Sequence, residues 1–238
     1  MVFPLVLFPS AVLGAFSGLL VPEFTEAHEK GDVHRIRRMA EKVLRTSLLF
    51  SLGVAGIFLS FAHEIGGGMY PGTDAGVQLA RVAPLIPVMY LDSSVDAMLK
   101  GLGEQLHCMK INIADSAVSL LLVVLLLPRL GLDGYIIVLY VCELMNAALS
   151  ISRLLAVTDL RVRLGHWIAR PILSVILATS AVRLLSAYGG IPLIGAGGSA
   201  ATRIAAASVL YVLFTAVTGA IGKADVAFVR SVLRRQEV

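Results

Sequence analysis

The dominant pattern of this 238-residue chain is a series of long apolar stretches separated by short polar segments. A helix that crosses the hydrocarbon core of a bilayer needs about 20 mostly apolar residues, a length rarely seen in soluble domains. Seven windows of roughly this kind predict an all-α integral membrane protein with seven transmembrane helices. The windows are 2–21, 44–62, 77–99, 111–127, 135–156, 168–187 and 201–221.

The composition favours a membrane protein over a soluble one. The chain is 57% hydrophobic and 15% charged, whereas soluble domains carry about 25% charged residues. The net charge of +4 could indicate nucleic-acid binding. The basic residues, however, lie in short loops beside the apolar stretches, where membrane topology places them. We therefore expect membrane lipids, and no nucleic acid, as partners.

Lys and Arg concentrate in alternate gaps between the apolar windows. The gaps 66–78 and 188–200 contain neither residue. Because positively charged loops stay on the cytoplasmic side, the alternation predicts a multi-pass protein with its N-terminus outside and its C-terminus in the cytoplasm. The first basic gap holds Lys30, Arg35, Arg37, Arg38, Lys42 and Arg45, and the last segment holds Lys223, Arg230, Arg234 and Arg235.

The first basic gap also has a helical pattern of its own, within residues 25–45. From Val33 to Leu44, apolar residues recur at helical spacing, and charged residues fill most other positions. This pattern predicts a cytoplasmic amphipathic helix with Asp32 as its N-cap. The helix either lies at the level of the lipid headgroups or forms a solvated linker.

Glycine and proline mark two further features. Residues 66–76 contain five glycines, so we expect a mobile turn there and no helix. Pro84 and Pro87 fall inside the window 77–99. We expect them to bend that helix and to free backbone carbonyl groups.

Polar residues form three stripes inside the apolar windows. Asp92, Asp96 and Lys100 are spaced four apart and therefore share one helix face. Similar helical spacing places Asn112 with Asp115, and Glu143 with Asn146. A charge within the bilayer is costly, so each of these residues predicts either a partner or a hydrated cavity.

Two interpretations of these stripes remain open. In the first, they face a cavity that holds a polar headgroup or a coupling cation. In the second, they only pack the helices together, with Asp96 pairing to Lys100 and Glu143 accepting a hydrogen bond from a nearby Ser or Asn. The candidate cavity residues are Asp92, Asp96, Asn112, Asp115, Glu143 and Asn146.

No pattern in the chain indicates an enzyme. There is no arrangement of Ser, His and Asp with supporting turns, and no loop is large enough to form a sugar-nucleotide site. Cys108 and Cys142 are far apart, and the five histidines are scattered, so no spacing is typical of a zinc site. We expect no catalytic residue, no metal and no cofactor.

Several short motifs resemble one family of transporters. In order they are FPSAVLG at 8–14, VPEFTEA at 21–27, Gly31-Asp32, APLIPVMYLD at 83–92, LKGLGEQ at 99–105, Asn112 and LPRLGLDGY at 127–135. Together they resemble the second half of polysaccharide and lipid-linked oligosaccharide flippases of the multidrug/oligosaccharidyl-lipid/polysaccharide superfamily. The branch that they resemble most is that of stage V sporulation protein B, which is related to the lipid II flippases.

The resemblance implies a fold and a function. Residues 1–160 would form five helices of a C-terminal lobe, and residues 161–238 two further helices with a cytoplasmic tail. The family has two lobes, and Met1 leads directly into an apolar window, so we expect a preceding lobe to be missing or separately encoded. The resemblance implies movement of a lipid-linked oligosaccharide or polyprenyl-phosphate sugar across a bacterial plasma membrane, by alternating access, for polysaccharide or cell-wall synthesis.

Two other functions remain open at this stage. A cation-coupled multidrug exporter of the same superfamily would use Asp92 or Glu143 to bind Na⁺ or H⁺. A non-transporting membrane scaffold for cell-wall or spore-envelope synthesis would need none of the polar stripes. The cavity residues known for the lipid II flippases lie mostly in the first lobe, so the candidate residues above rest on the cost of burying them.

Overall fold

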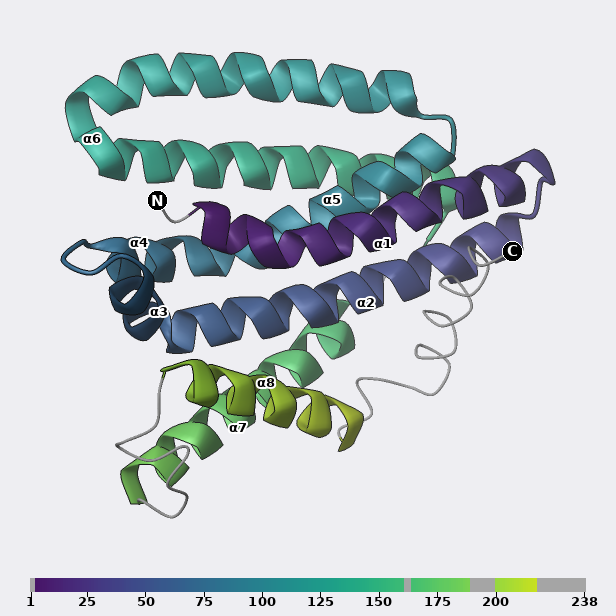
Figure 1. Cartoon of the computed structure of the whole chain (residues 1–238). Coiled ribbons are helices and arrows are strands. Elements are labelled where there is room, and N and C mark those ends of the chain that lie inside the picture. The colour runs from purple at the N-terminus through teal and green to yellow at the C-terminus, as the bar shows by residue number, and fades with distance from the viewer. Residues whose placement is uncertain (1–2, 161–163, 189–199, 218–238) are drawn as a thin grey trace. The chain divides into compact units, whose positions relative to one another are not determined.

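The computed structural model describes residues 3–160, 164–188 and 200–217, and every regular element in these ranges is helical (Figure 1). The all-α prediction is therefore confirmed for this part of the chain. The elements are α1 (Phe3–Glu29), α2 (Val33–Ser60), α3 (Ala62–Met69), α4 (Ala75–Val82), the 3₁₀ helix η1 (Ala83–Leu85), α5 (Ile86–Gly101), α6 (Gln105–Thr158), α7 (Leu164–Tyr188) and α8 (Ala200–Val217).

Four helical segments of the described residues are long and apolar enough to cross a membrane. They are Phe3–Glu29, Val33–Ser60, Ala75–Gly101 and Gln105–Thr158. Two shorter apolar helices, Pro171–Leu184 and Ala201–Ala216, coincide with the last two predicted windows. The structure is thus compatible with a multi-pass membrane protein, while the number of seven spans remains a prediction.

Helix α6 consists of two limbs that run in opposite directions (Figure 1). A straight helix of its 54 residues would be about 80 Å long, far more than the roughly 30 Å of a hydrocarbon core. Gly131 interrupts it with φ 56° and ψ −130°, a conformation that only glycine adopts readily. Pro128 lies just before this reversal. The two limbs correspond to the predicted windows 111–127 and 135–156.

The surface of α6 is strongly apolar. Leu106 is 71% exposed, Leu120 67% and Val124 63%. Large exposed side chains of this kind would form an unfavourable patch in water. They are well suited to contact with lipid chains.

The predicted helix over 77–99 contains a short 3₁₀ turn at its prolines, while the bend itself stays a prediction. The segment 77–99 is divided into α4, η1 and α5. Because Pro87 has no N–H, the carbonyl oxygen of Ala83 accepts a hydrogen bond from the N–H of Ile86 instead. The expected freeing of a backbone carbonyl is therefore not seen at Ala83, whose oxygen stays paired.

The prediction of a mobile glycine-rich turn was wrong for Gly66, Gly67 and Gly68, which lie in α3. A Cβ on Gly66 would clash with the backbone of Gly76, and a Cβ on Gly76 would lie 2.8 Å from Cα of His63. The glycines therefore allow the backbones of α3 and α4 to touch. This packing outweighs the low helix propensity of glycine, and the loop is reduced to residues 70–74.

The chain divides into two compact units, each made of discontinuous segments. Unit 1 comprises Met1–Pro9, Leu48–Ile86 and Arg163–Val238, and unit 2 comprises Ser10–Ser47 and Pro87–Val162. These two units are defined by contacts in the structure. The division into residues 1–160 and 161–238 is a different one, which rests on the resemblance to transporter lobes and stays a prediction.

In unit 1, helices α7 and α8 pack against small residues of α2. A Cβ on Gly53 would clash with the ring of Tyr211, and one on Gly56 would clash with Val175. The hydroxyl of Tyr211 donates a hydrogen bond of 2.6 Å to the carbonyl oxygen of Leu49. Small residues at such contacts are typical of helix packing in membranes, because they allow close approach of the backbones.

In unit 2, the end of α5 packs closely against the end of α1. The hydroxyl of Thr25 donates to the carbonyl oxygen of Gly101 at 3.1 Å, and a Cβ on Gly101 would lie 2.7 Å from Cβ of Phe24. The buried hydroxyls of Ser47 in α2 and Ser94 in α5 are 2.8 Å apart. These contacts hold α1, α2 and α5 in one bundle, which positions the acidic face of α5.

Candidate functional site

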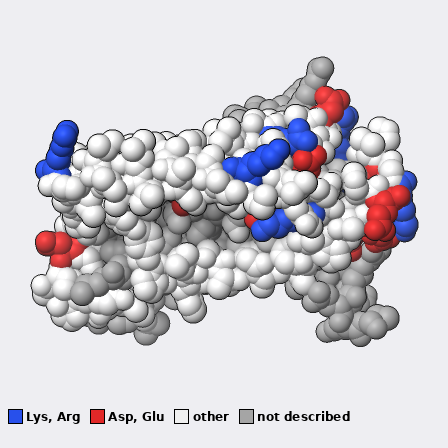
Figure 2. All heavy atoms as spheres, turned by 90° about the horizontal axis from the view of Figure 1, so that it is seen from above, with Lys and Arg blue, Asp and Glu red and all other residues white. Residues whose placement is uncertain are grey.

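Two ion pairs connect the beginning of α2 and both ends of α6, which therefore lie at the same end of unit 2. Arg37 of α2 pairs with Asp159 at 2.9 Å, just after α6. Arg153 makes a bidentate pair with Glu104, the residue before α6, with a shortest distance of 2.7 Å. In Figure 2, most of the visible atoms of Lys, Arg, Asp and Glu lie toward one side of the view, beside a wide area without charged residues. The described basic gaps predicted to be cytoplasmic thus lie together in this unit.

The described residues include only part of the basic residues that predict the topology. Arg161 and Arg163, as well as Lys223, Arg230, Arg234 and Arg235, lie outside the described residues. The orientation of the termini across the membrane therefore stays a prediction.

The predicted N-cap of α2 is confirmed. The backbone N–H of Arg35 donates to Oδ1 of Asp32 at 2.9 Å, which satisfies one of the free donors at the start of a helix. The amphipathic segment forms the first turns of α2, and its apolar residues Ile36, Met39 and Val43 are buried. Protein therefore covers the apolar face of this segment.

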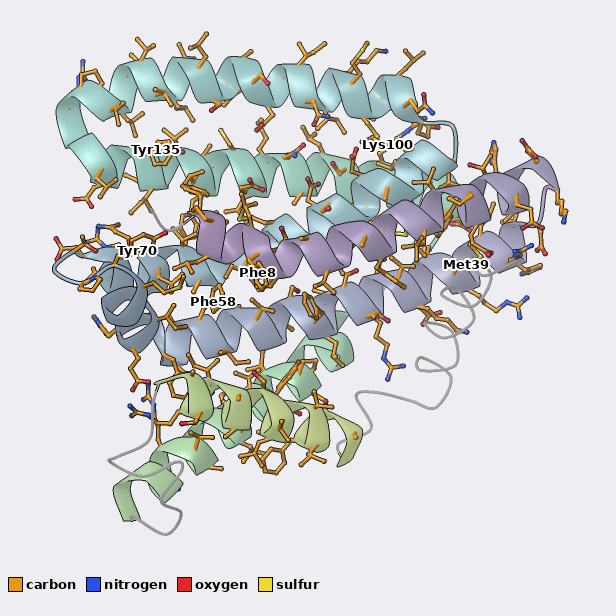
Figure 3. All side chains as sticks on the ribbon, in the orientation of Figure 1. Phe8, Met39, Phe58, Tyr70, Lys100 and Tyr135 are labelled. Carbon is orange, nitrogen blue, oxygen red and sulfur yellow. The ribbon has the colours of Figure 1, made fainter. Side chains whose placement is uncertain are left out.

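The acidic stripe on α5 has two different environments. Near the charged end, Asp96 pairs with Lys100 at 2.6 Å, as the spacing predicted. Figure 3 shows Lys100 close to the turn between α5 and α6, far from Tyr135 near the reversal of α6. One turn deeper, Asp92 accepts a hydrogen bond of 2.9 Å from Nδ2 of Asn146. This bond joins the stripe of α5 to the second limb of α6.

Two more predicted carboxylates lie near Asp92. If they were all ionised, Asp92, Asp115 and Glu143 would act unfavourably on one another through their like charges. These residues come from α5 and from both limbs of α6. None of the three forms an ion pair with another residue in the described ranges. Together with Asn146 they form what we call the acidic cluster.

The acidic cluster contains hydrogen-bond acceptors that lack donors. Oδ1 of Asp92, Oδ1 of Asp115 and Oδ1 of Asn146 are buried without a hydrogen-bond partner in the part of the chain that the structure describes. The hydroxyl of Ser150 lies beside Asp92, and the thiol of Cys142 lies beside Asp115. Since unpaired buried acceptors are unfavourable, this arrangement favours a bound proton or a ligand with donor groups.

The cluster is not arranged as a metal centre. Among the described residues, no group of three or more His, Cys, Asp or Glu side chains could hold a metal ion.

The remaining candidates lie elsewhere. Asn112 is exposed on the first limb of α6, whereas Asp115 is half-buried. Asp96 is engaged by Lys100. The predicted acceptance of a hydrogen bond by Glu143 is not seen, since Glu143 has no hydrogen-bond partner within the described ranges. Of the six sequence-predicted residues, the structure brings together Asp92, Asp115, Glu143 and Asn146.

Sequence reasoning missed some polar contacts. The pair Ser47 and Ser94, and the partner of Arg153, were not foreseen. Ser94 follows Asp92 by two residues, but nothing in its own window indicates which helix it meets. The partner of Arg153 could have been predicted, because Glu104 is the acidic residue closest to the start of α6 and Arg153 is a basic residue near its end.

Comparison with known proteins gave no match of any kind: no protein-family model, no curated protein and no solved structure is similar to this chain. The resemblance to flippases therefore remains a prediction based on its short motifs.

Proposed function

We propose that this chain is part of a membrane transporter that moves a lipid-linked sugar precursor across a bacterial plasma membrane by alternating access. The observation that carries the proposal is the acidic cluster, which lies on helices long and apolar enough to span a bilayer. Ionisable residues within a membrane are expensive and usually mark a transport pathway. The motif resemblance gives the substrate class.

The acidic cluster suits a coupling role better than direct contact with the substrate. The phosphate groups of a lipid-linked sugar are negative, so Asp92, Asp115 and Glu143 would repel them. A bound proton would instead relieve the repulsion among these carboxylates. We propose that protonation of the cluster alternates with movement of the sugar headgroup.

Alternating access needs a second bundle against which the first can move. We therefore propose that the chain acts with a first lobe, with seven spans and an external N-terminus. The basic ends of unit 2 would face the cytoplasm in this topology.

The test is a flipping assay with a fluorescent lipid-linked sugar in proteoliposomes. We expect no movement with the chain alone, and movement with the complex purified from its native membrane. Movement by the chain alone would contradict the need for a first lobe. No movement by the complex, together with retention of cell-wall synthesis enzymes by it, would favour the scaffold function over transport.

The acidic cluster also supports a second candidate, a cation-coupled multidrug exporter. This function requires carboxylates that bind and release Na⁺ or H⁺, and the acidic cluster offers three without a cationic partner among the described residues.

The two candidates differ in substrate. With an imposed Na⁺ or H⁺ gradient, an exporter would expel cationic dyes, and Glu143→Gln would abolish this efflux. Glu29→Gln, at an exposed position beside the α1–α2 turn, is the matched control and should leave efflux unchanged. Gradient-dependent movement of the lipid-linked sugar without any dye efflux would rule out the exporter.

A further inference from the structure

The two limbs of α6 are joined at both of their ends, in different ways. At the reversal, the chain turns at Gly131, which has a φ of 56°. At the other end, Arg153 near the end of the second limb holds both carboxylate oxygens of Glu104, just before the first limb, at 2.7 and 2.8 Å from one guanidinium nitrogen. The limbs are therefore connected by a glycine at one end and by an ion pair at the other.

Gly131 has the properties of a hinge. A Cβ added to it would meet nothing within 4 Å, so its φ and ψ can change without displacing packed side chains, and glycine makes such changes at the lowest cost. Pro128, about one turn earlier, supplies no backbone donor to the helix. Hinges in proteins are usually a few residues at the end of a helix that absorb changes of this kind.

The first limb is packed less tightly than the second. Its buried residues are Cys108 and Ile111, whereas the second limb has buried residues along its whole length, from Gly134 to Thr158. Leu120, in the middle of the first limb, is 67% exposed. Elements with few buried contacts open more readily than the core of a protein, so the first limb is the one that can move.

The acidic cluster lies between the hinge and the ion pair. Asp115 is on the first limb, about 16 Å of helix away from Glu104. The thiol of Cys142 lies beside Asp115, on the second limb and about 16 Å of helix away from Arg153. Cys142 is only 7% exposed. Separation of the limbs at the charged end would part Asp115 from Cys142 and allow water to reach the cluster.

We propose that the pair of Glu104 and Arg153 is a latch, and that its opening about the hinge at Gly131 admits water and protons to the acidic cluster from the charged end of unit 2. The side chains of Glu104 and Arg153 are 23% and 36% exposed, so water can solvate both charges when they separate. Glu104 makes no side-chain hydrogen bond that caps α6, which leaves its carboxylate to the latch. Opening of the latch would serve the coupling role proposed above.

The test uses the natural Cys142 as a reporter of opening, in the whole chain with Cys108→Ser, purified in an uncharged detergent. The probe is a cationic methanethiosulfonate, which modifies thiols that water can reach. Glu104→Gln should accelerate modification of Cys142 about threefold to tenfold, because a charged hydrogen-bonded pair at a partly exposed site contributes about this factor. The matched control, Asp159→Asn, removes a carboxylate from the pair with Arg37, which does not join the two limbs. It should change the rate less than about twofold.

Two further measurements separate opening of the latch from general loosening of the fold. Arg153→Gln should accelerate modification as Glu104→Gln does, and the double variant should be no faster than either single one, since the same pair is lost in all three. Ser51→Cys places a thiol at a buried position of unit 1. In a chain with both natural cysteines replaced by serine, this thiol should react equally slowly with and without Glu104→Gln.

Three results would overturn the latch: an unchanged rate at Cys142 in Glu104→Gln, an equal acceleration by Asp159→Asn, and faster modification at position 51 in Glu104→Gln. None of these measurements involves transport. The latch and the proposed function can therefore fail independently of each other.

Discussion

At the scale of single residues, the sequence predicted contacts between side chains on the same helix. It did not predict contacts between side chains on different helices. Asp96 and Lys100 are four residues apart, so their pairing follows from helix geometry alone. Asp92 and Asn146 are separated by 54 residues. Their contact depends on how α6 folds back, which the composition of either window does not encode.

The bond between Asp92 and Asn146 gives a prediction for stability. A double-mutant cycle with Asp92→Ala and Asn146→Ala should show a coupling of about 0.6 kcal/mol, and at most about 1.7 kcal/mol, the range found for hydrogen bonds between membrane helices. The measurement is the free energy of unfolding in detergent or lipid.

Ser152 supplies the control for this cycle, because it is exposed and its hydroxyl donates only within its own helix to the carbonyl oxygen of Leu149. Ser152→Ala should not couple to Asp92→Ala. A coupling of zero between Asp92 and Asn146 would mean that the observed bond does not contribute to folding.

At the scale of helices, local signals predicted the breaks well when a residue imposes them directly. Pro87 lacks a donor, and a 3₁₀ turn lies at the prolines of the window 77–99. Gly131, with a positive φ, lies in the gap between the predicted windows 111–127 and 135–156. The segment 66–69 differs, because its helical state depends on contact with α4. A run of glycines indicates flexibility only when no neighbour needs their small size.

Two adjacent glycines of α3 test this explanation. Gly66→Ala should destabilise unit 1, since the new methyl group would clash with the backbone of Gly76. Gly67→Ala should be neutral or stabilise by up to about 1 kcal/mol, because nothing lies within 4 Å of its added Cβ and alanine favours the helix.

Thermal unfolding of both variants in the same detergent provides the measurement. Similar melting temperatures for the two variants would show that close packing of α3 and α4 does not determine the helix.

At the scale of the whole molecule, the charge pattern predicted which turns of unit 2 lie at the same end. Its physical basis is the electrostatic cost of moving cations across the membrane during insertion. The charge pattern could not predict which segments belong to which unit, because each unit is assembled from segments far apart in the chain. Hydropathy reports where helices begin and end, but not their neighbours.

The membrane topology can be tested with single cysteines. The variants His34→Cys and Thr73→Cys place a thiol at exposed positions, in the first turn of α2 and in the loop 70–74. The natural Cys108 and Cys142 are buried. In intact cells, a membrane-impermeant maleimide should label position 73 and not position 34.

Permeabilising the cells should make position 34 reactive as well. Labelling of position 34 alone in intact cells would show that the topology is the reverse of the predicted one. Labelling of both positions would show that this part of the chain is not inserted as predicted.

The boundaries between the two units have a mechanical consequence. They cut α1 between Pro9 and Ser10, α5 between Ile86 and Pro87, and α2 between Ser47 and Leu48. Pro9 and Pro87 stand at the boundaries in α1 and α5 and cannot donate a backbone hydrogen bond, whereas α2 has no proline at its boundary. Of the three helices that contribute residues to both units, α2 is therefore the one in which a bend at the boundary would break the most backbone hydrogen bonds.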